Sequence, residues 1–422
     1  MKNVWKKIVL ALKDRSIRNR IFFVVFALVV FRLLSVIPVP GVDRIALEQY
    51  LNSSQFFGIL NVFSGGGFST LSIVMLGVSP YITASIIMQL LTIIFPKVKE
   101  MYQENGEIGR QKFNKISRTL TIPLAFLQGF GFIKLFVSQG VMGPFTTFEY
   151  IVNVLIVAAG AMLVMWIGEL ITEYGIGNGA SMIIFAGIVA AFPTNVSQTL
   201  FAYDPSQLPV YIGFLVVGIL IIAGVVLVSE AERPVPVTYA RQVRGVGSST
   251  PTYLPIRMNQ AGVMPIIFAL SLLMFPRIIG SVLTASTNPT FITIGQNITK
   301  IFVDNQLVYG ILNFVLVVFF TYFYTAVTFD PDQVATNLQK NGAFIPGVRP
   351  GIPTSEYLAS VTVRITLFGS LFLGLIAVLP LIVQSISGIT SLAIGGTALL
   401  IVVSVVTDLI KKIDAQISMR EY

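Results

Sequence analysis

The chain has 422 residues, of which 55% are hydrophobic and only 11% are charged. Soluble domains carry about 25% charged residues, and a soluble chain of this length cannot hide so much apolar surface in one core, so the composition predicts a membrane protein. The net charge is +9, but the basic residues fall in short blocks between apolar runs, which is typical of membrane topology and not of a nucleic-acid-binding face.

The sequence contains no Cys and no His. Disulfides, thiolate metal sites and thiol nucleophiles are therefore excluded. Imidazole zinc sites and Ser-His hydrolysis are excluded as well. We expect neither a metal ion nor another cofactor.

The first 20 residues are basic and place Trp5, Ile8, Val9 and Leu12 on one helical face. This pattern favours a short amphipathic helix on an anionic cytoplasmic leaflet, and a basic tail is the alternative. The apolar run that follows, residues 21–37, has no small-residue cleavage site, so we interpret it as a retained first span and not as a signal peptide.

Ten segments are apolar enough to cross a bilayer, at about 20 residues each. Lys and Arg number seven in the first 20 residues and five in the loop 96–116, and recur in every second loop thereafter. The positive-inside rule therefore predicts an even number of spans with both termini in the cytoplasm. The approximate limits of the predicted spans are 21–37, 73–95, 117–138, 148–171, 179–197, 209–229, 261–283, 306–328, 361–383 and 389–410.

Two predicted cytoplasmic loops, 230–260 and 329–360, are long and mix Pro, Gly and Arg with apolar residues. Orientation signals alone explain the charges of these loops but not their lengths. We therefore favour a structured docking surface for a cytosolic partner.

The predicted spans contain few ionisable residues: Arg32 lies near the end of the first span, and Glu169 and Glu173 at the cytoplasmic end of the fourth. Ion-coupled transporters carry such groups at mid-membrane depth, so their scarcity favours a pore that passes its cargo without chemistry. The alternatives are a secondary transporter of a small solute, an intramembrane enzyme and a non-conducting scaffold for insertion factors.

Residues 61–72 are apolar enough to enter a membrane but too few to cross it, and the run Gly65–Gly67 lets the backbone turn. Such a segment is tolerated at membrane depth only where it is buried in protein or lines a cavity. A mobile re-entrant element is the favoured interpretation, and an ordinary external loop is the alternative.

In the second span Val78 and Ile82 lie four residues apart and share a helical face, as Ala180 and Ile184 do in the fifth. Small neighbouring residues let helices approach closely. Aliphatic side chains that point inward can gate a pore by excluding water and ions. By spacing alone, ordinary helix packing is the more common explanation.

Several strings, in order along nearly the whole chain, resemble the SecY family of bacterial translocon channel subunits. The resemblance rests on Val30–Arg32, Ile37–Gly41, Phe63–Gly66, Pro80–Leu91, Gly106–Arg110, Gly175–Gly179, Ile183–Ile188, Asn259–Pro265, Gly342–Gly351 and Gly395–Thr397.

The resemblance implies an all-α integral membrane protein with ten transmembrane helices, in two inverted five-helix halves, and a re-entrant plug helix. Residues 1–20 would be a cytoplasmic amphipathic segment, 21–200 the first half, 201–410 the second half with the docking loops, and 411–422 a cytoplasmic tail. The implied location is the bacterial cytoplasmic membrane.

The resemblance also implies the roles of individual residues. A pore ring would surround the translocating chain, a plug at 61–72 would close the pore from outside, and a lateral gate would open between the second and third spans and the seventh and eighth. The pore ring would be Val78, Ile82, Ala180, Ile184, Ile267 and Ile401; the plug would include Asn61, Phe63, Ser64, Gly65, Gly66, Gly67 and Phe68; Gln89 would lie near the gate; and Arg241, Arg244 and Arg349 would dock a motor or a ribosome.

The function implied is the conduction of unfolded secretory polypeptides across the membrane and the lateral release of transmembrane segments into lipid. No nucleotide-binding P-loop is present, so the energy must come from elsewhere. The implied partners are the SecE and SecG subunits, the SecA motor ATPase, the ribosome, signal peptides, nascent polypeptides and membrane lipids, with no sequence-specific nucleic acid. Catalysis is not expected.

Overall fold

The structure is a computed structural model that describes residues 14–43, 45–47, 61, 64–103, 106–201, 208–239, 252–284, 288–387 and 390–418. The predicted amphipathic face of Trp5, Ile8, Val9 and Leu12 lies outside the described residues, as do Phe63, Arg241 and Arg244.

Each of the ten predicted spans coincides with a long helix in the structure. The helices of the first set are α2 (Arg15–Leu34), α5 (Ser79–Ile94), α7 (Gly106–Ser138), α8 (Thr147–Tyr174) and α9 (Gly179–Phe201). Those of the second set are α10 (Leu208–Glu230), α11 (Met264–Thr284), α13 (Gln306–Thr328), α15 (Ile352–Ser387) and α16 (Thr390–Ser418).

Length and hydropathy make four helical segments of the described chain candidates to cross a membrane, namely Gly106–Ser138, Thr147–Tyr174, Gln306–Lys340 and Ile352–Leu379. The pair Ser79–Ile94 and Pro96–Tyr102, bent by 116°, adds a fifth if it counts as one span. The chain is thus a multi-pass helical membrane protein, and the full count of ten spans stays a prediction.

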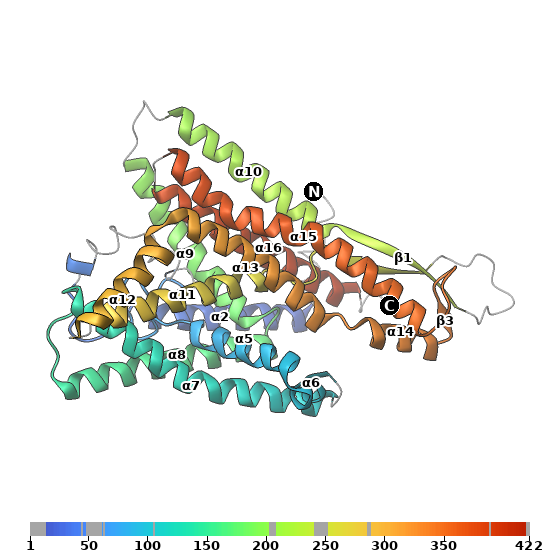
Figure 1. Ribbon diagram of the computed structural model, residues 1–422, viewed down its shortest axis with the longest axis horizontal. Coiled ribbons are helices and arrows are strands. Elements are labelled where there is room, and N and C mark those ends of the chain that lie inside the picture. Colours follow the sequence, from blue (N-terminus) through green and yellow to red (C-terminus); the bar gives the residue numbers. More distant parts are fainter. Residues whose placement is uncertain are drawn as a thin grey trace.

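The two sets of five helices make the same internal contacts. In each set the first helix packs against the fourth and the fifth, the second against the third, the third against the fourth, and the fourth against the fifth. The sets meet where α11 packs on α5 and α7, and where α9 packs on α16. In Figure 1 α2, α5, α7 and α8 of the first set occupy the lower part of the bundle, and α10, α15 and α16 occupy the upper part.

Short elements cap the two ends of this bundle. The strands β1 (Glu232–Tyr239), β2 (Thr252–Arg257) and β3 (Ala343–Phe344) form a sheet in the order β2-β1-β3. This sheet, α6 (Pro96–Gln103) and α14 (Pro331–Lys340) project at one end of the bundle, and α12 (Pro289–Thr299), which continues into the π-helix η2 (Lys300–Asp304), lies at the other (Figure 1).

The sheet joins the two long loops, which the sequence predicts to be structured. Strand β1 pairs antiparallel with β2 from Glu232 opposite Arg257 to Val237 opposite Thr252, and with β3 at Thr238 and Tyr239. Val235, Ile256, Ile345 and Leu358 form a small buried core beneath it. The described parts of the loops 230–260 and 329–360 therefore pack together as one unit.

The predicted re-entrant plug helix differs from what the structure shows. Residues 64–72 form consecutive turns instead of a helix, and the turns continue to residue 78, so α5 begins six residues after the predicted limit at 73. The backbone explains this, because Gly65, Gly66 and Gly77 adopt positive φ angles, and so does Leu71, at 42°. Left-handed residues interrupt a right-handed helix.

Candidate channel site

The six predicted ring residues come together in the largest apolar cluster of the described chain. Five of them are buried, and Ala180 is partly buried and packs against the others' cluster. They come from α9, α11, α16 and the start of α5, so they belong to the second and fifth helices of both sets. The ring members are Val78, Ile82, Ala180, Ile184, Ile267 and Ile401.

The plug segment is held together by its own polar groups. The carbonyl oxygen of Asn61 accepts hydrogen bonds from Gly66 N (2.8 Å) and Ser64 Oγ (3.1 Å), and its Oδ1 accepts one from Ser69 N (3.0 Å). Ser64 Oγ accepts from Phe68 N at 2.9 Å. These bonds stabilise a compact fold in a segment that has no regular secondary structure over 64–72.

Apolar contacts fix the plug segment to the first set of helices. The ring of Phe68 is buried beside Phe132 and Phe136 of α7, with centroids 5.3 and 5.6 Å away. Gly65 lies so close to α9 that a Cβ placed on Gly187 would be 2.2 Å from Gly65 Cα. A side chain at position 187 would therefore clash with the backbone of the plug segment.

The plug is also joined to the chain that follows α2. Val39 N donates to Leu71 O, and Ile73 N donates to Ile37 O, both at 2.9 Å. Thr70 Oγ1 donates to Ser35 O at 2.7 Å. The plug segment and the chain that follows the first span therefore form one structural unit.

A cavity of about 190 Å³ adjoins the ring on the side opposite to the plug. Val78, Ile82 and Ala180 line it together with Gln89, whose Oε1 is buried and has no hydrogen-bond partner among the described residues. A second cavity of about 270 Å³ shares Asn178, Met264 and Tyr324 with the first, and opens toward the loops. The two cavities form a vestibule of mixed polar and apolar lining that adjoins the predicted ring.

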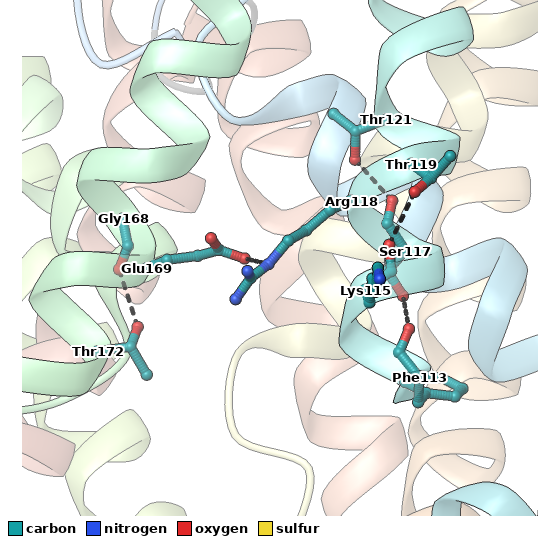
Figure 2. Close-up of polar contacts among 9 residues, drawn as sticks. All are labelled: Phe113, Lys115, Ser117, Arg118, Thr119, Thr121, Gly168, Glu169 and Thr172. Atoms are coloured by element: carbon teal, nitrogen blue, oxygen red, sulfur yellow. Dashed lines mark hydrogen bonds and ion pairs between the residues drawn. The ribbon is translucent and has the colours of Figure 1, made fainter. Parts of the chain in front are cut away.

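An ion pair at the edge of this vestibule connects α7 to α8. Figure 2 shows the Arg118 side chain reaching from α7 toward α8, where its Nε contacts the Glu169 carboxylate. The Arg118 side chain is 50% exposed and that of Glu169 is 17% exposed. Glu169 stands out in the sequence as a carboxylate at a span end, but its partner could not be inferred from spacing.

The helices of the predicted lateral gate pack closely in this structure. Helix α11 contacts both α5 and α7, and Phe268 of α11 packs edge-to-face on Phe320 of α13 with 5.8 Å between ring centroids. Ser79 Oγ donates to Gln128 Oε1 at 3.4 Å between α5 and α7. The sequence analysis did not single out Gln128, a polar residue that is buried on a predicted gate helix.

Of the predicted docking residues, Arg349 is described and its side chain is exposed. Its carbonyl oxygen accepts a hydrogen bond from Thr354 Oγ1 at 2.8 Å, which ties the loop to the start of α15. No group of three or more acidic, His or Cys side chains that could hold a metal occurs within the described ranges.

Comparisons with known proteins place this architecture. The SecY family model matches residues 72–410. The protein translocase subunit SecY of Thermus thermophilus is 41% identical, covering 98% of this chain and 95% of the relative. That of Porphyra purpurea is also 41% identical, covering 96% and 98%.

Solved structures share the fold at lower sequence identity. A SecY structure, whose plug domain is described as stabilising the closed state of the translocation channel, has a TM-score of 0.67 at 19% identity, covering 96% of this chain and 93% of that one. Sec61 from a canine ribosome–channel complex has a TM-score of 0.64 at 18% identity, covering 96% and 94%.

The helical bundle and its internal vestibule define a multi-pass membrane channel of the protein-conducting class. The family match covers most of the chain, and the two relatives above are 41% identical over nearly their full length. The chain belongs to the SecY family, and its function is protein translocation.

Proposed function

We propose that unfolded secretory polypeptides pass between the two sets of helices, from the vestibule through the aliphatic ring and past the displaced plug. The observation that carries this path is one face of α9. Ala180 lines the vestibule, Ile184 belongs to the ring cluster, and Gly187 touches the plug segment. Residues at i, i+4 and i+7 share a helical face. The vestibule, the ring and the plug segment therefore follow one another along about 10 Å of α9.

The aliphatic ring suits this cargo. A pore for chains of arbitrary sequence must bind no side chain strongly, and aliphatic side chains exclude water and ions without charge. The plug, packed on α9 at Gly187 and on α7 at Phe132 and Phe136, supplies a second barrier. Together they explain how a path wide enough for a polypeptide stays closed at rest.

The packing of α11 on α5 and α7 supports a lateral exit at this junction. Transmembrane segments leave the pore there, because each large aliphatic residue gains roughly 0.3–0.6 kcal/mol at the bilayer centre. The identical contacts within the two sets support two halves, 21–200 and 201–410, with ten spans in total. The basic loops favour cytoplasmic termini, and the bacterial cytoplasmic membrane is the location implied by the family resemblance.

The joined loop unit is the proposed docking surface for a cytosolic motor or a ribosome. Its sheet, its own apolar core and the exposed Arg349 support this role. One structural relative, the canine Sec61, is described in a ribosome–channel complex. SecE, SecG and SecA remain the partners expected from the family resemblance, and no catalytic role is proposed.

The test uses the absence of native cysteine. A single Cys at Ile82 or Ile401 is combined with a stalled secretory substrate that carries one Cys, in vesicles that contain the channel and its partners. We expect an oxidative cross-link at both positions, because both side chains belong to the buried ring cluster.

The matched control is Ile219→Cys, on the exposed side of α10. A stalled, membrane-engaged chain that cross-links to residue 219 as well as to 82, or to none of the three positions, would contradict the proposed path.

A further inference from the structure

The inner part of the vestibule carries one charge. Of the residues that line the cavity of about 190 Å³, all of them described, Glu169 alone is ionisable to a charged form at neutral pH. The others are apolar or neutral polar side chains such as Tyr81, Ser85 and Asn114. The outer cavity differs, because Arg257, Lys411, Lys412 and Asp408 line it.

The outer cavity is therefore lined by more basic than acidic residues. A positively charged group that enters from the loops passes this cavity first and then meets the Glu169 carboxylate in the inner cavity. Two of the basic residues that line the outer cavity already form ion pairs. Lys411 Nζ lies 2.9 Å from Glu230 Oε1, and Lys412 Nζ lies 3.7 Å from Asp408 Oδ2. Glu169 therefore supplies the negative charge that attracts a cation into the inner cavity, in a protein whose net charge is +9.

The partner of Glu169 can be exchanged. Arg118 does not line the cavity, its side chain is half exposed, and it contacts Glu169 through Nε (Figure 2). Water screens an ion pair that has a half-exposed member, so an incoming Lys or Arg competes with Arg118 at little cost. The carboxylate also borders the cavity, so a ligand there reaches it directly.

The cavity is walled by the helices that a leaving apolar segment would pass. Tyr81, Ser85 and Gln89 belong to α5, Asn114 and Ser117 to α7, and Met264 begins α11. A segment that sits between α5, α7 and α11 with its N-terminus on the loop side would hold its N-terminal flank in this cavity. Secretory signal segments carry a positively charged region directly before their apolar run.

We propose that Glu169 is a specificity-determining residue that receives the basic N-terminal flank of a signal segment, by exchanging Arg118 for a Lys or Arg of the substrate. The carboxylate thereby favours the orientation in which the basic flank stays on the loop side while the apolar run enters the junction of α5, α7 and α11. This inference rests on the proposed function.

The experiment uses the whole channel with its partners in vesicles and a Cys at Ser85, which lines the same cavity. Two stalled substrates differ only in the flank, with three Lys or with three Gln, and each carries one Cys there. The measured quantity is the ratio of cross-linking between the basic and the neutral substrate. Glu169→Gln should lower this ratio about two- to fivefold.

Two further variants separate recognition from folding. Glu173→Gln, at an exposed position one turn along α8, should leave the ratio unchanged. The double variant Arg118→Glu with Glu169→Arg keeps an ion pair between α7 and α8 but puts a cation on the cavity wall, so it should lower the ratio further than Glu169→Gln does.

The outcomes are distinct. If both substrates lose cross-linking equally in Glu169→Gln, or if the double variant restores the native ratio, the pair only holds α7 to α8 and the inference is overturned while the proposed function stands. If the native channel cross-links neither membrane-engaged substrate, the proposed function fails and the inference falls with it.

Discussion

Gly187 of α9 lies in close contact with Gly65 of the plug segment. A methyl group on Gly187 would lie 2.2 Å from Gly65 Cα, which no real contact allows, so the plug must shift away from α9. Overpacking of this kind costs about 1–3 kcal/mol. We expect Gly187→Ala to destabilise the seated plug and to raise the ion conductance of the resting channel in planar bilayers.

Gly218→Ala in α10 is the matched control, because nothing lies within 4 Å of a Cβ at that position. Both substitutions improve helix propensity, by up to about 1 kcal/mol, so a leak confined to Gly187→Ala cannot come from unfolding of the helix. A resting conductance equal to that of the native channel would mean that the plug does not seal through this contact.

At the scale of elements, the end of α16 links the two sets of helices. Lys411 Nζ donates to Ser229 O at 3.1 Å and pairs with Glu230 of α10, within the second set. Two and six residues later, Ile413 and Ile417 pack against Ile17 of α2 and against Ile176, both in the first set. The helix end therefore fastens the halves together beside the outer vestibule.

Replacing Ile413 and Ile417 by Ala removes apolar contacts that join the two halves. Since both side chains are only partly buried, we expect a loss of about 1–2 kcal/mol each in the free energy of unfolding, below the range for fully buried sites. Thermal unfolding in detergent measures it. Ile410→Ala, at a side chain 50% exposed on the same helix, is the control and should change stability by under about 0.5 kcal/mol. Equal melting temperatures for the double variant and the control would argue against the fastening role.

The long helices could be predicted from the sequence because a membrane-spanning helix needs about 20 consecutive apolar residues. Few other structural elements need such a long apolar run, so the hydropathy of the sequence identifies these helices directly. The sheet could not. The alternation of Val235 and Val237 with exposed neighbours is short and includes two prolines, and the partner of Thr238 is Phe344, more than a hundred residues along the chain. Short helices such as α6 and α12 also lack a span-length signal.

The site was predictable in a different way. Spacing alone could not separate ring residues such as Ile82 and Ile184 from ordinary packing residues, and the family resemblance supplied them. The structure adds that they share one buried cluster. Two polar contacts join residues that are far apart in the sequence, namely the ion pair of Arg118 with Glu169 and the hydrogen bond of Ser79 with Gln128. No local sequence pattern could predict either contact.

At the scale of the whole molecule, the two sets of helices meet along two junctions, α11 with α5 and α7, and α9 with α16. The ring cluster draws on helices from both junctions, and the described part of the plug segment packs on α7 and α9 of the first set. Under the proposed function, we expect a relative movement of the two sets of helices to widen the ring. Opening across one junction alone would release a segment sideways and leave the other junction as a hinge.

Deleting residues 61–72 tests this arrangement. The deletion removes the second barrier and leaves the ring, so we expect a raised ion conductance in planar bilayers and transport of substrates with weakened signal segments, because the closed state loses the contacts of the plug with α7 and α9. Phe68→Ala keeps the chain length and removes the buried ring beside Phe132 and Phe136. It should shift both properties in the same direction by a smaller amount. Unchanged conductance in both variants, with native melting temperatures, would show that the ring alone seals the channel and that signal selection resides at the junction of α11 with α5 and α7.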